Sequence, residues 1–475
     1  MRRPLAIAAA ATVVLLPAPA GAAAVPVVVL EGRGHGHGVG MAQDGAYWMG
    51  RGGASTAQIL NQFYPGTTQG RSGGEVRVTV LATAGATVLG FPGGGEIRDA
   101  RDGGHSAGFP VRLGAGGQAR VRFDGRQYAV EILGGGMAAA PAPTAGQVAA
   151  PAGGGPTLVP AQEATTTTTT PPTTTGGLGL LQPGKPLLPL PTLPAITVPT
   201  TTTTTTAAVP TTAAPAAAAG RASSPGGLWA VPAGGGTVAV PERSHRYRGV
   251  LQVVGSDGLR LVNHVDVEQY LRGMGEVRNP SWPAASLRAQ AIAARTYALR
   301  AMTGGGQLCD TQQCQVYLGA EAEYAAMDKA VTATRGQVVF YRRGLASTVY
   351  SANGGGFSAS TEEGFGTPGA GFPYLRPARY QTSDPSPWSL TVSLRDVAAR
   401  VGYRGRISAI RTESAGPSGR VLQVVLEGSG GRRAVRGVDF DRALGLKSTL
   451  FTVKLAESAT APPPPPPAEG PLGAA

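Results

Sequence analysis

The sequence is poor in cysteine, and after its first residues it lacks any long hydrophobic run. Its two cysteines are fewer than the about four ligands that a structural zinc site needs. No segment after the N-terminus approaches the roughly 20 consecutive apolar residues of a membrane-spanning helix. In contrast, 72 glycines and 40 prolines are spread over 475 residues. Much of the chain is therefore unsuited to a packed core, and a single packed domain is not expected.

The N-terminus has the pattern of an export signal. Met1-Arg2-Arg3 precedes an apolar, alanine-rich run that ends near Leu16, and small residues follow from Ala18 to Ala24. We expect residues 1–24 to be a signal peptide and the protein to be secreted. A retained single-span anchor is the alternative.

Basic side chains exceed acidic ones. Without Arg2 and Arg3, 39 basic side chains remain against 28 acidic ones. In an exported protein this excess favours transient contact with anionic polymers or a membrane surface over nucleic acid. Charge that serves only solubility is the alternative.

Composition divides the chain into folded and low-complexity parts. From 136 to 225 the sequence is dominated by Ala, Pro, Gly and Thr, and such a segment cannot bury enough apolar surface to offset its ordering entropy. We expect a disordered linker there and a Pro-rich tail at 456–475. Between 73 and 135, three segments alternate apolar and polar residues as half-buried strands do, which predicts a small β unit.

The segment 228–455 is predicted to be the main domain, of α+β class. Strand pairs are indicated, one of them a hairpin at 248–265 closed by Asp257-Gly258. Helices are predicted at 283–302, 321–333 and 394–401. Antiparallel strand pairs with a few helices packed beside them form an α+β domain.

One carboxylate lies in an informative place. Glu276 is on a loop broken by Gly and Pro, directly ahead of the helix predicted at 283–302. Pro283 suits the first turn of a helix, where its missing N–H has no consequence. Gln290 and Tyr297, seven residues apart, share one face of that helix, away from its apolar stripe. A polar helix face beside a loop glutamate predicts the wall of a cleft.

The stretch from Tyr270 to Leu299 resembles the SpoIID/LytB family, named after a stage II sporulation protein and an amidase enhancer of bacterial cell walls. Tyr-Leu, a loop Glu, Trp282-Pro283 and a helix with Ala-Gln-Ala and Ala-Ala-Arg-Thr-Tyr-Ala match the family pattern. Shorter similar segments occur at 309–319, 351–356 and 373–376. The resemblance covers roughly 240–453 and implies a SpoIID-like main domain in a protein of the cell wall.

The resemblance implies that Glu276 is the acid/base of a lytic transglycosylase that acts on peptidoglycan glycan strands. Ordinary glycosidases need two carboxylates. A lytic transglycosylase manages with one, because the 6-hydroxyl of the substrate is the nucleophile and closes a 1,6-anhydro ring. Glu268 is eight residues back along the chain. The alternative is a solvated loop glutamate paired with Arg278.

Further substrate-binding residues are implied by their positions in the family pattern. They are Trp282, Gln290, Arg295, Tyr297 and Ser351, with His37 and Gln43 from an N-terminal motif. Tyr297 and Trp282 are equally compatible with roles as core aromatics. No cofactor is expected, the implied partner is the glycan strand, and a cell-wall amidase is a second candidate partner.

If Glu276 is a general acid, as the resemblance implies, its pKa has to be raised. A general acid works best with a raised pKa, whereas nearby arginines lower it. Three arginines are close in sequence: Arg272, Arg278 and Arg295. We expect Trp282 and Met274 to desolvate the carboxyl group, and Arg295 to hold substrate instead of pairing fully with Glu276.

Cys309 and Cys314 are the only cysteines. In an exported protein, two cysteines five residues apart favour a disulfide on a loop. Some family members hold a metal through a nearby His and two Cys, and a metal here would have to recruit His264 or His245. We expect the disulfide and no metal.

A glycine-rich motif lies in an unusual place. Residues 32–43 match the family's Gly-x-Gly-x-Gly-His-Gly-x-Gly-Met-x-Gln motif. In the arrangement known for the family, this motif closes the domain after a segment like 444–453. We therefore predict that residues 31–66 fold back onto the main domain across the linker. Whether His37 and Gln43 then reach Glu276 is open from the sequence.

Two other functions stay open. The chain is also compatible with a non-catalytic wall-binding protein that stimulates an N-acetylmuramoyl-L-alanine amidase, as the LytB name implies. A surface adhesion module on a Thr/Pro-rich stalk would explain the linker but not the Glu276 loop. A link to sporulation follows only from the family name.

Overall fold

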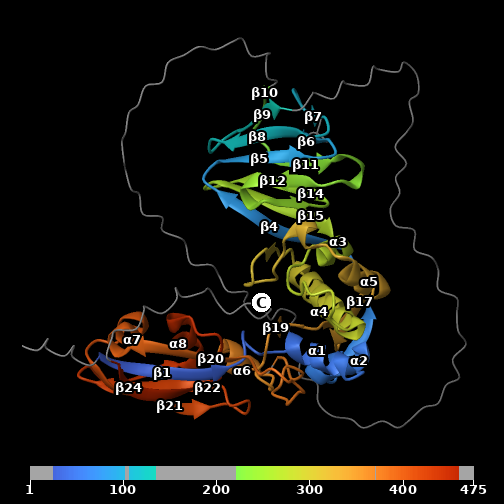
Figure 1. The fold of residues 1–475 in the computed structure, drawn as a ribbon. Coiled ribbons are helices and arrows are strands. Elements are labelled where there is room, and N and C mark those ends of the chain that lie inside the picture. The colour runs from blue at the N-terminus through green and yellow to red at the C-terminus, as the bar shows by residue number, and fades with distance from the viewer. Residues whose placement is uncertain (1–24, 102–105, 135–220, 370, 459–475) are drawn as a thin grey trace, which may run out of the picture. The chain divides into compact units, whose positions relative to one another are not determined.

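The computed structural model describes residues 25–101, 106–134, 221–369 and 371–458. These residues combine helices and antiparallel strands (Figure 1), which confirms the α+β prediction. The predicted signal peptide, linker residues 136–220 and tail residues 459–475 lie outside the described residues. In the described part, no helix is long and apolar enough to cross a bilayer.

The largest sheet has seven strands in the order β16-β4-β15-β14-β11-β6-β7. Its members are β4 (Glu75–Thr83), β6 (Gly95–Asp99), β7 (Val111–Leu113), β11 (Leu228–Pro232), β14 (Val250–Gly255), β15 (Leu259–Asp266) and β16 (Leu308–Cys309). The alternation that predicts a half-buried strand at 75–80 corresponds to burial of Val76, Val78 and Val80. These side chains belong to one continuous hydrophobic core.

A second sheet has six strands in the order β10-β9-β8-β5-β12-β13. Its members are β5 (Ala86–Phe91), β8 (Gly117–Phe123), β9 (Tyr128–Gly134), β10 (Arg221–Ser224), β12 (Val238–Val240) and β13 (His245–Tyr247). The segment 73–135 is therefore not a separate β unit, because β4 pairs with β15, β6 with β11 and β9 with β10. Alternation finds half-buried strands but does not reveal their partners. Strand β10 also shows that the predicted linker extends too far at its C-terminal end.

Helix α4 (Ala284–Met302) is the central helix of the segment that carries Glu276. It begins after Pro283, as predicted, and 13 of its 19 residues are buried. The sequence predicts one apolar stripe on this helix, but the buried residues of α4 cover more of its surface, because helices and strands surround it on several sides. Its neighbours include α1 (Gln43–Arg51), α2 (Thr56–Phe63), α3 (Val267–Arg272), α5 (Ala325–Ala333) and β17 (Gln337–Tyr341). The helix predicted at 321–333 is shorter, since a 3-10 turn at Gly319–Ala322 precedes α5.

Short strands complete this region. Strand β17 lies between β3 (Thr68–Arg71) and β18 (Gly344–Leu345), and β2 (Met41–Ala42) pairs in parallel with β19 (Tyr350–Ser351). The β2–β19 pair joins the N-terminal glycine-rich motif to the segment that contains Ser351.

The N-terminal strand β1 (Val25–Arg33) lies between β20 (Pro387–Ser393) and β24 (Phe451–Ser458), as Figure 1 shows. A second hydrophobic core is formed by β1, β20 and the elements that follow β20 along the chain. Those elements are α7 (Leu394–Val401), β21 (Ile407–Ala415), β22 (Val421–Gly428), β23 (Gly431–Arg436) and α8 (Gly437–Leu444). Helix α6 (Thr361–Phe365) contacts α8. The predicted tail at 456–475 thus begins inside β24.

The pairing of β1 with β24 brings the glycine-rich motif at the start of the chain next to the last strand that the structure describes. The register pairs Gly32 with Phe451, and the Arg33 N–H donates to the Leu450 carbonyl at 3.1 Å. The motif therefore leaves β1 directly beside the segment 444–453, as the predicted folding back of residues 31–66 requires.

Candidate active site

Glu276 lies on the loop between α3 and α4. The Gly275 N–H donates to the Val316 carbonyl at 2.8 Å, and the Leu318 N–H donates to the Gly273 carbonyl at 2.9 Å. A Cβ at Gly275 would lie 2.8 Å from side-chain atoms of Leu318 and Val316, so a larger residue would require these side chains to shift. The Val316 N–H also donates to Glu276 Oε1 at 2.7 Å. The backbone at 316–318 thus fixes the position of the carboxyl group.

Glu276 is half-buried, and its carboxyl group is only partly satisfied. Its Oε2 atom is buried and has no hydrogen-bond partner among the described residues. Burial raises the pKa of Glu276 from 4.5 to about 8, while the Val316 N–H, Gln43 and Tyr350 favour the charged form and limit the rise. Such a group is mostly protonated at neutral pH, as a general acid must be.

The three arginines that are close in sequence do not act on Glu276. Arg272 lies 3.9 Å from Asp328 and Arg278 is exposed. In the part of the chain that the structure describes, Glu276 accepts its hydrogen bond from a backbone N–H and forms no ion pair with Arg278. The expected conflict between a raised pKa and neighbouring guanidinium groups is therefore absent from this geometry.

Gln43 brings the N-terminal motif to the site. It is the first residue of α1, and its Nε2 donates to Gln290 Oε1 at 3.5 Å. Its side chain also lies close enough to Glu276 to influence the pKa of that carboxyl group. In the β2–β19 pair, Ala42 is directly opposite Ser351. Residues from four separate parts of the sequence therefore meet here.

The same neighbourhood contains unsatisfied polar atoms. Gln290 Nε2 and Ser351 Oγ are buried and, like Glu276 Oε2, have no hydrogen-bond partner within the described residues. Leaving a buried polar group unpaired costs about 1–3 kcal/mol, so such groups need an explanation. These unpaired atoms make the surroundings of Glu276 a candidate site for a polar ligand.

A hydrogen-bonded chain of buried side chains lies next to Glu276. Tyr270 donates to Gln315 Oε1 at 2.9 Å, and Gln315 Nε2 donates to the Tyr350 hydroxyl at 2.7 Å. Tyr350 in turn favours the charged form of Glu276. Neither Gln315 nor Tyr350 was predicted as a site residue from the sequence. The signal was present, because Gln315 lies in the similar segment 309–319 and Tyr350 precedes Ser351.

Two aromatic residues predicted to bind substrate are half-buried. Tyr297 is two helical turns from Gln290 on α4, and burial followed by the Glu276 charge raises its pKa to about 12. Trp282 packs against the hydrophobic core, and its ring lies 5.3 Å from that of Tyr47. Both residues are near the Glu276 loop, and their contact with substrate stays a prediction.

Arg295 was expected to hold substrate, but the structure gives it another environment. Its side chain is fully buried and forms a two-pronged ion pair with Glu268, at 3.0 Å from Nε to Oε1 and 2.6 Å from Nη2 to Oε2. Its Nη1 donates to the Gln337 carbonyl at 3.1 Å. Arg295 therefore ties α4 to α3 and β17, and each of its three guanidinium nitrogens is already hydrogen-bonded within the protein.

His37 was also expected to contact substrate, but the structure gives it another environment. It is 3% exposed, accepts a hydrogen bond from the Val39 N–H at Nδ1, and packs against Phe365 at 4.6 Å. Burial, and secondly Arg420, lower its pKa to about 3, so the ring is neutral. His37 shapes the glycine-rich loop, and Gln43 is the motif residue that reaches Glu276.

Cys309 and Cys314 form a disulfide. It closes the loop directly ahead of Gln315 and Val316, the two residues that hold Tyr350 and Glu276. His264 bonds instead to Glu75 and Gln252. Among the residues that the structure describes, no three His, Cys, Asp or Glu side chains gather as a metal site.

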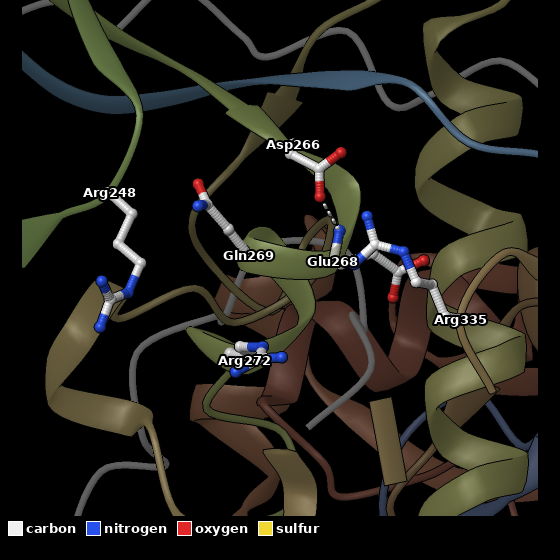
Figure 2. A pocket seen from close by; sticks show the side chains of 6 residues that line it. All are labelled: Arg248, Asp266, Glu268, Gln269, Arg272 and Arg335. Carbon is white, nitrogen blue, oxygen red and sulfur yellow. Dashed lines mark hydrogen bonds between the residues drawn. The ribbon is translucent and has the colours of Figure 1, made fainter. Parts of the chain in front are cut away.

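Two adjoining cavities lie around Asp266 and Glu268, and Glu276 lines neither of them. The first, of about 430 Å³, is drawn in Figure 2. Its walls are formed by Arg248, Asp266, Glu268, Gln269, Arg272 and Arg335. Asp266 caps the Glu268 N–H at 3.0 Å, Glu268 pairs with Arg295, and Arg248 pairs with Glu323. Because most of these charges already have partners, the cavity is not the candidate active site.

Comparison with known proteins matches residues 255–341 to the SpoIID family, described as Stage II sporulation protein. The chain is 32% identical over 135 residues to an uncharacterized protein of Brachyspira hyodysenteriae, covering 27% of this chain and 36% of that one. It is 36% identical over 114 residues to the amidase enhancer of Bacillus subtilis, covering 24% of this chain and 15% of that one. The chain thus spans little more than a third of one relative and less than a sixth of the other. No solved structure matches.

Proposed function

We propose that this chain, whose residues 255–341 match the SpoIID family, is an exported lytic transglycosylase that cleaves peptidoglycan glycan strands in the cell wall. The observation that carries this proposal is the state of Glu276. Its carboxyl group is held by one backbone N–H, has an unpartnered Oε2, and has a pKa of about 8.

The reaction needs two proton transfers and no water. The protonated carboxyl group of Glu276 donates its proton to the glycosidic oxygen on C1 of N-acetylmuramic acid, and the C1–O bond breaks with its electron pair on that oxygen. The 6-hydroxyl oxygen of the same sugar bonds to C1, and the Glu276 carboxylate takes the hydroxyl proton. The products are a free hydroxyl on one fragment and a 1,6-anhydro ring on the other, and Glu276 is again protonated.

The remaining polar groups have matching roles. Val316 occupies Oε1, so Oε2 is the oxygen available for proton transfer. Gln290 Nε2 and Ser351 Oγ offer unused hydrogen bonds to the hydroxyl and acetamido groups of a sugar. Proton transfer by a placed side chain contributes about 10²–10⁴-fold to a rate.

Product analysis tests the proposal. The secreted chain and its Glu276→Gln variant are incubated with peptidoglycan stripped of its peptides, and the soluble products are identified by mass spectrometry. We expect 1,6-anhydro-muramyl products from the wild type and none above background from the variant. Equal release of these products by both proteins would contradict the role of Glu276.

A second function is favoured by the name of the Bacillus subtilis relative, the amidase enhancer. In this case the Glu276 site binds glycan without cleaving it, and the chain stimulates a separate amidase. Stimulation of a purified N-acetylmuramoyl-L-alanine amidase, equal for the wild type and Glu276→Gln and without anhydro products, would favour this function.

A further inference from the structure

Helix α1 carries a group of aromatic residues that the proposed reaction does not use. The ring centroids of Tyr47 and Trp48 lie 5.1 Å apart, and Tyr47 lies 5.3 Å from Trp282. The guanidinium carbon of Arg51 lies 5.9 Å from the Tyr47 ring centroid and 5.7 Å from that of Trp48. We refer to Tyr47, Trp48, Arg51 and Trp282 as the aromatic cluster.

The cluster is partly open to solvent. Its three aromatic side chains are half-buried and Arg51 is exposed. Trp282 is packed against the hydrophobic core, whereas the ring contacts of Tyr47 and Trp48 are with each other, with Trp282 and with Arg51. An aromatic body with a polar tip is suited to a surface that is wet on one side and covered by a ligand on the other.

The cluster is connected to the Glu276 site by two elements. Gln43 and Tyr47 lie one turn apart on the same face of α1, a rise of about 6 Å. Gln43 acts on Glu276, and Trp282 follows Glu276 on the same loop. Helix α1 is fixed against the start of α4, because the Ser286 hydroxyl donates to the Ala46 carbonyl at 2.7 Å. Glu276 and the aromatic cluster are therefore connected through α1 and the start of α4, which are hydrogen-bonded to each other.

We propose that the aromatic cluster is a glycan-binding subsite, which holds a sugar of the strand beyond the bond that Glu276 cleaves. This inference rests on the proposed substrate class. A pyranose ring presents an apolar face of C–H groups, whose slightly positive hydrogens suit the negative face of an aromatic ring. Arg51 adds a positive charge at the edge, where the carboxylates of N-acetylmuramic acid and its stem peptides are complementary to it.

The subsite is tested by binding in a Glu276→Gln background, so that the strands stay intact. Affinity for peptide-stripped glycan strands is measured for this protein and for the same protein with Tyr47→Ala and Trp48→Ala. We expect affinity to fall at least tenfold. Trp229→Ala is the matched control, because Trp229 is also half-buried but packs on His264 at 4.8 Å, and its affinity should not change.

Arg51→Gln gives a second test that does not depend on removing a ring. Arg51 is exposed, so the variant should keep the thermal midpoint of its parent. We expect about threefold to tenfold weaker binding of carboxylate-bearing strands and unchanged binding of neutral N-acetylglucosamine oligomers. Unchanged affinity for both ligands in Arg51→Gln, together with unchanged affinity in the folded Tyr47→Ala/Trp48→Ala variant, would overturn the subsite.

The outcome is separable from that of the proposed function. If the wild type releases no anhydro products but binding depends on Tyr47 and Trp48, the result supports the subsite and contradicts the proposed cleavage. If anhydro products form at the same rate and affinity with and without the two rings, cleavage stands and the subsite falls.

Discussion

Glu268 lies in α3 and Glu276 lies eight residues later, on the loop that follows the helix. The two carboxyl groups differ in how many of their oxygens are hydrogen-bonded. Both oxygens of Glu268 are bonded, by the Arg295 guanidinium and by the Gly336 N–H at 2.8 Å. Glu276 has one backbone bond to Oε1 and no partner for Oε2 among the described residues. A carboxylate that is fully paired joins structural elements, whereas one that is shielded and left incomplete is available for proton transfer.

Glu276→Gln should have the largest effect, and it should affect activity alone. Gln has nearly the same shape but cannot donate and accept the two protons, so the rate of anhydro-product release should fall by about 10²–10⁴-fold. The urea midpoint should not decrease, because the neutral amide suits a shielded site. A large loss of stability without loss of activity would reverse the roles assigned to the two glutamates.

Glu268→Gln should show the opposite pattern. It leaves the Arg295 guanidinium buried without a counter-charge, which typically costs about 3–5 kcal/mol of folding free energy. The free energy of unfolding in urea measures this loss. Glu131→Gln is the matched control, since Glu131 pairs with Arg120 at 3.6 Å near the surface, and such a pair contributes about 1 kcal/mol or less. Similar losses in the two variants would show that the buried pair does not join α3 to α4 as described.

The double variant Cys309→Ser/Cys314→Ser should moderately lower both the stability of the fold and the rate of product release. Removing the link that closes this short loop should lower the free energy of unfolding by about 2 kcal/mol. Because the loop precedes Gln315 and Val316, the rate of product release should also fall. Loss of stability with an unchanged rate would indicate that the disulfide does not help to hold the Val316 N–H on Glu276.

The pH dependence of stability should separate the Glu276 site from the rest of the molecule. The folded-state pKa of Glu276, about 8, is above the ordinary value of 4.5, so the folded protein binds this proton more tightly than the unfolded chain. Its contribution to stability is fully present below about pH 4.5 and is lost as the pH rises through about 8. The free energy of unfolding should therefore fall more steeply over this range in the wild type than in Glu276→Gln. Parallel curves for the two proteins would contradict the raised pKa.

Gln43→Ala should give the smallest effect. Gln43 favours the charged form of Glu276, so its removal should raise the pKa of Glu276 further and move the high-pH decline in activity to higher pH. The loss of its hydrogen bond to Gln290 should lower the free energy of unfolding by about 1 kcal/mol or less. A shift of the decline to lower pH would show that Gln43 acts on Glu276 in the opposite sense.

The parts that could be predicted from the sequence are those set by local chemistry. Pro283 and the alanine-rich sequence after it predict α4, and the Gly and Pro residues around Glu276 predict the loop that carries it. Alternation also predicts the strand at 75–80. In each case the signal lies within a few residues of the feature it predicts.

The parts that could not be predicted depend on partners far apart in the sequence. Arg295 looks like a free cation on a polar helix face until Glu268, 27 residues earlier, is placed against it. Strands at 73–135 look like a separate unit because their partners follow residue 220. The surroundings of the Glu276 carboxyl group are formed by Gln43, Val316 and Tyr350, which no single stretch of sequence contains.

Cleavage of peptide-stripped glycan strands in ¹⁸O-labelled water tests the single-acid mechanism most directly. If Glu276 performs both proton transfers and the 6-hydroxyl makes the new bond, every new muramyl end is lighter by one water than a hydrolysis product and carries no ¹⁸O. New ends that carry ¹⁸O would show that water is the nucleophile, and the mechanism built on Glu276 alone would be wrong.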